Sequence, residues 1–228
     1  MEAGVFLALN ESTPPDLIVQ AAQAVEERGF HAIWVPEHVV LFDEYESKYP
    51  YSPDGRIGNY GKGMMEPFTA LTYLAAHTSK VRLGTAICLV TQRNPIYTAK
   101  QVADVDYLSG GRVNFGIGLG WLREEFAALN VPFEKRGKRA NEHIAVMKAL
   151  WCQEVSKYHG ELYDLQSCVM YPKPIQTPHP PIFVGGEGDH ALNRVAALAQ
   201  GWLGASMEPE VITERIATLH HLLDERGR

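Results

Sequence analysis

Residues 81–120 read VRLGTAICLVTQRNPIYTAKQVADVDYLSGGRVNFGIGLG and contain the pattern that decides the fold. The nearly continuous apolar run 81–90 predicts a strand, and residues 95–108 predict the helix that follows it. The turn Ser109-Gly110-Gly111 closes this helix, and the next strand is expected at 113–118. Strands this apolar are typical of a parallel sheet that is covered on both faces.

The same alternation of strand and helix continues on both sides of this unit. Further strands are expected at 4–9, 32–36, 182–184 and 202–205, and further helices at 14–28, 67–77, 138–151, 190–199 and 209–226. Two long segments interrupt the pattern, at about 39–66 and 155–181. We interpret them as insertion loops of one domain that covers residues 1–228, the first with the length of a lid and the second containing a hairpin.

The order of the elements predicts an α/β fold with a parallel sheet and right-handed crossovers. About six such strands are predicted, whereas a closed barrel of this kind has eight. Two architectures therefore stay open at this point, a barrel that is shortened at its C-terminal end and an open sheet.

Composition excludes several classes of protein. The 228 residues include 27 acidic and 21 basic side chains, a formal net charge of −6, which disfavours a nucleic-acid partner. No uncharged apolar stretch reaches the roughly 20 residues of a membrane helix. Three cysteines without C-x-x-C spacing, and Glu2 where a signal peptide would be basic, predict a cytoplasmic protein with reduced thiols.

The carboxyl ends of the predicted strands are where parallel α/β folds bind ligands. Five of these ends carry small or polar residues, namely Asn10, Glu37-His38, Thr85-Ala86-Ile87, the stretch from Gly116 through Gly118 to Gly120, and Gly185-Gly186-Glu187-Gly188. Small residues let the backbone approach a flat ring or a phosphate closely. These positions are the candidate ligand-binding residues.

The two glycine clusters have different interpretations. Gly116, Gly118 and Gly120 do not form the dinucleotide fingerprint, because Trp121 occupies the next position, so a strand-to-loop turn and a ligand contact are supported equally. Residues 185–188 lead directly into a predicted helix. Free amides at a helix start suit an anion, which favours a phosphate contact there over a plain turn.

Glu37 and His38 are the candidate catalytic residues. Imidazole exchanges protons near neutral pH, so His38 is interpreted as a proton donor or acceptor, with a hydrogen-bonded pocket histidine as the alternative. Adjacent strand residues face opposite sides, which leaves Glu37 open between a site residue and an ion-pair partner. The remaining histidines lack metal-binding spacing, and we expect no metal site.

Several motifs, taken together and in order, resemble the bacterial luciferase-like monooxygenase superfamily. They are WVPEH (34–38), VRLGT (81–85), RNP (93–95), AKQ (99–101), LSGGR (108–112), GIGLGW (116–121), EEF (124–126), PKPIQ (172–176) and PPIFVGG (180–186). The resemblance implies a TIM (β/α)8 barrel of the bacterial luciferase type that lacks its last strands at the C-terminus.

Members of this superfamily use either FMN or the deazaflavin coenzyme F420. Luciferases carry an Arg within the glycine stretch that contacts the FMN phosphate, and Leu119 stands at that place here, which favours F420. The loop 49–56 also looks like that of deazaflavin-dependent members. The resemblance implies cofactor contacts at Thr85, Ala86, Ile87, Gly116, Gly118, Gly185, Gly186, Glu187 and Gly188, with a cis peptide bond between Ala86 and Ile87.

The function implied by the resemblance is hydride transfer between F420 and a small organic substrate, with His38 handling the accompanying proton. An FMN-dependent monooxygenase and a non-catalytic flavin-binding relative are the alternatives. The resemblance also implies a homodimer. The sequence does not identify the substrate or the direction of the reaction.

Overall fold

The computed structural model describes residues 2–58 and 62–228, and within them seven strands form one parallel sheet. The sheet order is β1-β2-β3-β5-β8-β9, and β4 takes over the pairing with β5 where β3 leaves it. The strands are β1 (Gly4–Phe6), β2 (Ala32–Val35), β3 (Arg82–Thr85), β4 (Cys88–Leu89), β5 (Val113–Gly118), β8 (Ile182–Gly185) and β9 (Gly201–Leu203).

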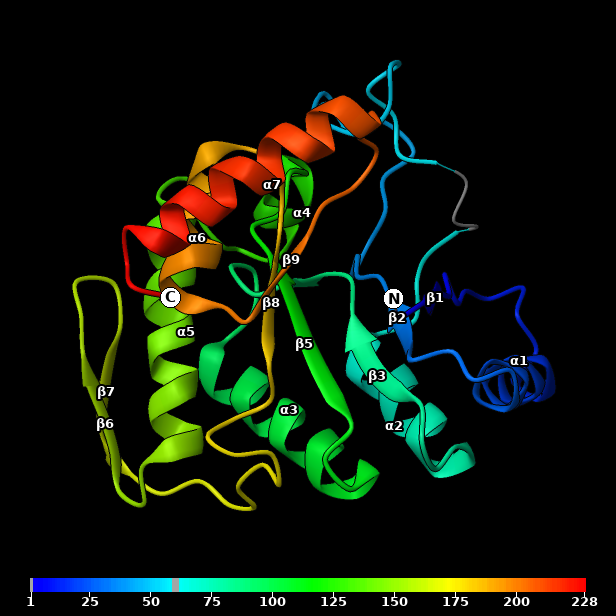
Figure 1. Cartoon of the computed structure of the whole chain (residues 1–228), viewed down its shortest axis with the longest axis horizontal. Helices are drawn as coiled ribbons and strands as arrows, with labels where there is room; N and C mark the ends of the chain where they lie inside the picture. The colour runs from blue at the N-terminus through cyan, green and yellow to red at the C-terminus, as the bar shows by residue number, and fades with distance from the viewer. Residues whose placement is uncertain (1, 59–61) are drawn as a thin grey trace.

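The helices follow one another around the outside of the curled sheet (Figure 1). They are α1 (Pro15–Glu27), α2 (Pro67–His77), α3 (Pro95–Ser109), α4 (Arg123–Ala128), α5 (Arg136–Cys152), α6 (Asp189–Leu198) and α7 (Pro209–Asp224). A separate antiparallel hairpin, β6 (Ser156–His159) with β7 (Asp164–Cys168), lies beside α5. The fold is an incomplete barrel of parallel strands wrapped by helices.

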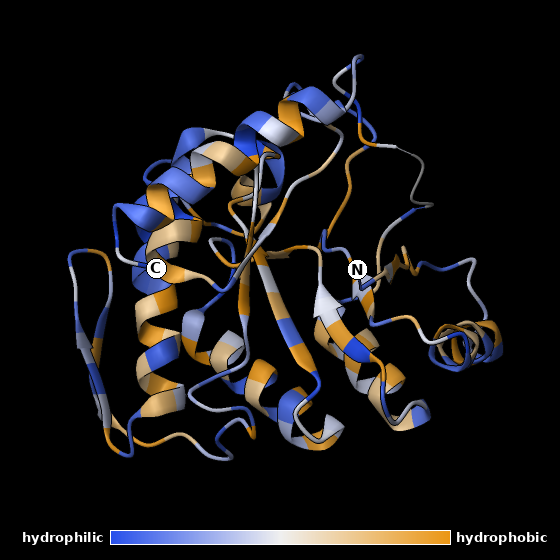
Figure 2. Ribbon diagram, viewed as in Figure 1, coloured by the Kyte–Doolittle hydropathy of each residue, from blue (hydrophilic) through white to orange (hydrophobic). Residues whose placement is uncertain are grey.

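The core lies between the sheet and these helices. All six residues of β5 are buried, which explains why its sequence is apolar without alternation. Figure 2 shows the apolar residues gathered on the strands and on the helix faces that cover them. Phe115 packs edge-on against Trp151 of α5, with ring centroids 5.9 Å apart. Burial of such faces, rather than intrinsic helix propensity, stabilises the arrangement.

The structure confirms the predicted α/β fold and corrects two details. The stretch 81–90 is not one strand, because β3 ends at Thr85 and β4 begins at Cys88, with a cis peptide bond between Ala86 and Ile87. The short helix α4 was not predicted, since its six residues are too few to show a periodic pattern. Within the described residues, no helix combines the length and apolarity that crossing a membrane requires.

Candidate functional site

A cavity of about 630 Å³ lies at the carboxyl ends of the strands. This volume is within the range of about 300–1,000 Å³ that is typical of small-molecule sites. Its wall is formed by residues at or just after the ends of the parallel strands, by α6 and by the segment that precedes α2. Among them are Phe6, His38, Tyr49, Tyr51, Ile57, Met64, Ala86, Ile87, Leu89, Leu119, Trp121, Gly185, Gly186, Arg194 and Leu203. The wall is therefore largely apolar, with few polar groups.

His38 contributes the imidazole on this wall and is held at both ring nitrogens. The indole N–H of Trp121 donates to His38 Nε2 over 3.3 Å, and His38 Nδ1 lies 2.9 Å from Glu125 Oε2. An indole N–H can only donate, so Nε2 accepts and the proton of the neutral ring is on Nδ1. The structure therefore fixes one tautomer, with Nε2 as the basic atom.

Glu125 is the carboxylate behind His38, and it is completely buried. Its oxygens accept hydrogen bonds from the backbone N–H of Val39 (2.7 Å) and from Nε2 of Gln92 (3.0 Å) as well as facing His38. Burial raises the pKa of Glu125, but the hydrogen bonds and the charge interaction with His38 outweigh it and lower the pKa overall. The carboxylate therefore stays ionised beside the imidazole.

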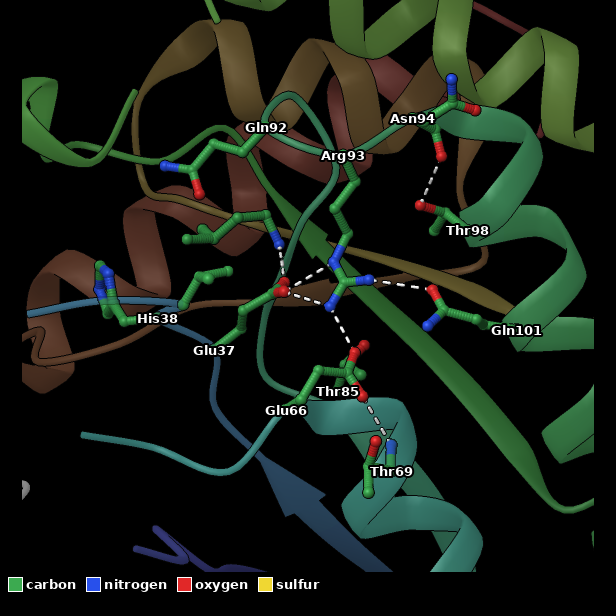
Figure 3. A network of polar contacts seen from close by, with 12 residues as sticks. Glu37, His38, Glu66, Thr69, Thr85, Gln92, Arg93, Asn94, Thr98 and Gln101 are labelled. Atoms are coloured by element: carbon green, nitrogen blue, oxygen red, sulfur yellow. Dashed lines mark hydrogen bonds and ion pairs between the residues drawn. The ribbon is translucent and has the colours of Figure 1, made fainter. Parts of the chain in front are cut away.

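Glu37 has different partners from His38, although the two residues are adjacent. Its carboxylate accepts from the backbone N–H of Leu89 and from Arg93 Nε, each over 2.6 Å, and Arg93 also pairs with Glu66. Figure 3 shows the Glu37 carboxylate directed at Arg93 and the His38 ring directed elsewhere. Glu37 thus ties the end of β2 to β4 and α2. It also lines the cavity, and its catalytic role stays a prediction.

The predicted cofactor contacts fall into two groups. Ala86, Ile87, Gly185, Gly186 and Gly188 line the cavity. The lining does not include the other four, which are Thr85, Gly116, Gly118 and Glu187.

These other four residues have partners in the wall. Thr85 Oγ1 donates to the Gly116 carbonyl over 2.6 Å. A Cβ at Gly116 would collide with the Thr85 carbonyl oxygen, and one at Gly118 would collide with the Ile87 side chain. The carboxylate of Glu187 accepts from the backbone N–H of Ala205 over 3.0 Å. The two glycines therefore allow the segment with the cis peptide bond to pack closely against β5.

Residues 39–58, which follow β2, contribute to the cavity wall and are held by α4. Glu124 Oε1 accepts from the backbone N–H of Glu46 over 2.7 Å and of Ser47 over 3.2 Å. Burial raises the pKa of Glu124, but these hydrogen bonds and that of the Ser47 hydroxyl lower it to about 2. The ring of Tyr49 meets Trp121 edge-on, with centroids 5.1 Å apart. Adjacent acidic residues of α4 thus hold the loop and orient His38.

Sequence reasoning did not assign a role to Glu125, Gln92 or Arg93. Glu125 and Arg93 lie within the motifs EEF and RNP. These motifs were the signal that could have pointed to the two residues. His38 and Glu125 are 87 residues apart, however, and no local sequence pattern pairs residues at that separation. Only the fold brings them together.

The protein has a barrel-type α/β fold with an apolar cavity at the strand ends, and a buried carboxylate orients an imidazole on the cavity wall. These features define a protein with a small-molecule site at the strand ends. The family model for luciferase-like monooxygenases matches residues 1–228, and the chain belongs to this family.

Three relatives show which proteins the chain is similar to. An uncharacterized protein of Mycobacterium tuberculosis is 36% identical over 211 residues, which are 92% of this chain and 72% of the relative. The FMNH2-dependent dimethylsulfone monooxygenase of Pseudomonas putida is 34% identical over 140 residues, 60% of this chain and 38% of the relative. The F420-dependent glucose-6-phosphate dehydrogenase of Kineococcus radiotolerans is 28% identical over 205 residues, 88% of this chain and 56% of the relative.

Solved structures show the same fold. The monooxygenase RslO1 of Streptomyces bottropensis superposes with a TM-score of 0.81 at 24% identity, over the whole of this chain and 67% of that one. The coenzyme F420-dependent tetrahydromethanopterin reductase of Methanopyrus kandleri superposes with a TM-score of 0.79 at 22% identity, over the whole of this chain and 62% of that one. These likenesses support the luciferase-type barrel as the fold of the chain.

Proposed function

We propose that this protein is an oxidoreductase that transfers a hydride between coenzyme F420 and a small organic substrate. The observation that carries the proposal is the oriented His38, with its Nε2 on the wall of a cavity large enough for a fused ring system. Membership of a family of redox enzymes supports the reaction class. A cytoplasmic location belongs to the same proposal.

The residues of the cavity fit a flat ring with a phosphorylated side chain. Ala86, Ile87 and Leu119 offer apolar surface, and Gly185 and Gly186 keep one end of the wall free of side chains. Gly186 has φ +114°, a conformation that L side chains rarely adopt, so this part of the wall depends on glycine. In the proposal Ala86 and Ile87 would hold the ring, and Gly185 to Gly188 would hold the phosphate.

When bound, the deazaflavin supplies the two-electron carrier, and the protein supplies orientation and proton handling. His38 Nε2 accepts or returns the proton that accompanies the hydride, after substrate displaces the Trp121 N–H from it. The ionised Glu125 holds the proton on Nδ1 and stabilises the imidazolium. Tyr49 and Tyr51 on the loop exclude water from the cavity.

Leu119 favours F420 over FMN, because it offers no charge where luciferases have the Arg that contacts the FMN phosphate. The similarity to the Kineococcus radiotolerans enzyme supports the same choice. An FMN-dependent monooxygenase is the second candidate, which the similarity to the Pseudomonas putida enzyme favours. The third candidate is a non-catalytic flavin-binding protein, in which His38 would transfer no proton.

Titration of the purified protein with F420 and with FMN, followed by quenching of tryptophan fluorescence, tests the proposal. We expect saturable quenching by F420 at lower concentrations than by FMN. Tight FMN binding without a response to F420 would refute the choice of coenzyme, and turnover of reduced FMN with oxygen would favour the monooxygenase. Turnover unaffected by His38→Ala would remove the catalytic role of the imidazole.

A homodimer is proposed on the exposed apolar side chains of α3. The side chain of Tyr97 is 75% exposed, and Tyr107 and Leu108 are also exposed on the same helix. These apolar side chains are available for a contact with a second copy of the chain. Light scattering on the purified chain tests the proposal, and a mass of one chain across the concentration range would contradict it.

A further inference from the structure

Arg194 of α6 is a buried cation on the wall of the cavity. Its exposed fraction is 9%, and it lines the cavity near Gly186 and Gly188. Within residues 2–58 and 62–228, no carboxylate lies within ion-pair distance of its guanidinium. A buried charge without a counter-ion is costly, which raises the question of what neutralises it.

The hydrogen bonds of Arg194 leave part of its guanidinium free. Nε donates to Asn141 Oδ1 over 2.7 Å, whereas Nη2 and Nη1 reach the carbonyls of Gly137 and His190 only at 3.3 and 3.5 Å. Arginine has five N–H donors. One of these N–H groups, on Nε, has a short hydrogen bond, and one on each Nη atom has a long one. In the part of the chain that the structure describes, the remaining two N–H groups on the Nη atoms have no acceptor.

Arg112 shows what a purely structural arginine looks like in the same molecule. It is 8% exposed, and it also lacks an ion pair within the described residues. All five of its N–H donors are used at 2.7–3.0 Å, by acceptors of Ala75, Thr78, Val81 and Ser109. Arg194 has equal burial but incomplete hydrogen bonding, and it borders a cavity.

The acidic groups close to Arg194 have other partners. Asp189, in the first turn of α6, pairs with Arg215 at 2.9 Å. Glu187 accepts from the backbone N–H of Ala205, and it also hydrogen-bonds the hydroxyl of Tyr51. Among the described residues, no side chain caps the start of α6. Ala191 N–H donates to the Gly188 carbonyl over 2.8 Å, so the donors left at this end of the cavity, within the described residues, are those of Arg194 and the backbone N–H groups of Asp189 and His190 at the start of α6.

We propose that Arg194 binds the phosphate group of the cofactor's side chain, in concert with the amino end of α6. This inference rests on the proposed function and adds to it the residue that supplies the charge. A guanidinium presents parallel N–H groups that match two phosphate oxygens, so the contact is expected to be bidentate. Binding of the phosphate would supply the counter-ion that the chain itself does not provide.

The experiment compares two pairs of ligands: FMN and riboflavin differ only by the phosphate and carry the test, whereas F420 also has the tail that its phosphate links to the deazaflavin. FMN is paired with riboflavin, and F420 with the phosphate-free deazariboflavin from which its chromophore derives. Dissociation constants are measured by tryptophan quenching for the wild type, Arg194→Gln, Arg194→Lys and the control Arg215→Gln. The control removes a positive charge close to α6 at a residue that does not line the cavity.

We expect Arg194→Gln to reduce the preference for the phosphorylated ligand by about 10- to 100-fold, because charge-assisted hydrogen bonds are lost. Affinity for the phosphate-free ligands and the preference of Arg215→Gln should stay at wild-type values. Arg194→Lys loses the same bond to Asn141 but keeps the charge, so an intermediate preference is expected. If Arg194→Gln does not fold, Arg194→Lys decides the test. A preference for the phosphorylated ligand at the wild-type value in Arg194→Lys would overturn the proposed bidentate contact.

The outcomes separate the inference from the proposed function. If the wild type binds none of the four ligands, the proposed function fails and the inference fails with it. If the wild type binds them and folded Arg194→Gln keeps the wild-type preference, the inference alone is overturned. An equal loss of preference in Arg215→Gln also overturns it, because a general charge effect would then explain the result.

Discussion

His38 Nδ1 and Glu125 Oε2 lie 2.9 Å apart, with the carboxylate fully buried behind the imidazole. This contact links the end of β2 to α4, two elements that are far apart in the chain. A carboxylate in this position fixes the tautomer of an imidazole and stabilises its charged form. We therefore regard Glu125 as a positioning residue for His38.

The first prediction concerns this pair. Glu125→Gln keeps the size of the side chain but removes the charge that stabilises the imidazolium. We expect kcat to fall by about 10- to 100-fold, as is typical for loss of such a partner, with little change in cofactor affinity. Steady-state kinetics and fluorescence titration measure the two effects. Equal losses in kcat and in cofactor affinity would instead indicate a collapsed cavity.

The second prediction concerns Glu37 and Arg93. Glu37→Gln removes one of the two carboxylates that neutralise Arg93 and leaves Glu66 as the other, so we expect the fold to be destabilised by about 2 kcal/mol, the cost of weakening a buried hydrogen-bonded pair. Glu37→Gln combined with Arg93→Met should cost less than the sum of the single changes. Urea unfolding measures both. A folded Glu37→Gln variant that loses kcat at unchanged stability would instead favour a catalytic Glu37.

The third prediction concerns the specificity for the coenzyme. Leu119→Arg introduces a charge at the position where the resemblance to luciferases implies an FMN phosphate contact. We expect the ratio of FMN affinity to F420 affinity to rise by about tenfold, the value of one modest charge-assisted contact. Leu119→Met is the matched control, since it adds length without charge. A ratio that is unchanged in the arginine variant argues against that phosphate position.

The fourth prediction is a pH dependence of the loop contact. The pKa of Glu124 is lowered to about 2 from an ordinary 4.5, so the contact stabilises the folded state above pH 4.5 and is lost as the pH falls toward 2. Glu124→Gln should therefore narrow the difference in stability between pH 6 and pH 3. Thermal unfolding at the two pH values measures this. Protease cleavage within residues 39–58 should also become faster in the variant at pH 6.

The sequence predicts most of the fold because strand and helix alternate with clear periodicity. The bounds predicted for residues 67–77 and 113–118 agree with α2 and β5. The break at Ala86-Ile87 followed from the family resemblance and not from the residues themselves, since the run 81–90 is nearly continuously apolar and shows no interruption at these two residues. Local patterns do not report a local change of backbone direction of this kind.

The sequence predicts less of the candidate site than of the fold. His38 could be identified because imidazole at a strand end is chemically distinctive. Its partner Glu125 could not, because the pairing depends on the position of a short helix that local periodicity does not reveal. Gly116 and Gly118 were predicted as ligand contacts with a structural turn as the alternative. The ligand contact stays a prediction, and their lack of a side chain makes room for Thr85 and Ile87.

The crystal structure of the protein with oxidised F420 tests the central claim most directly. We predict density for the fused ring against Ala86-Ile87, with the hydride-accepting carbon facing the Nε2 side of His38. A ring bound elsewhere on the molecule, or turned so that its reactive edge points away from His38, would contradict the account.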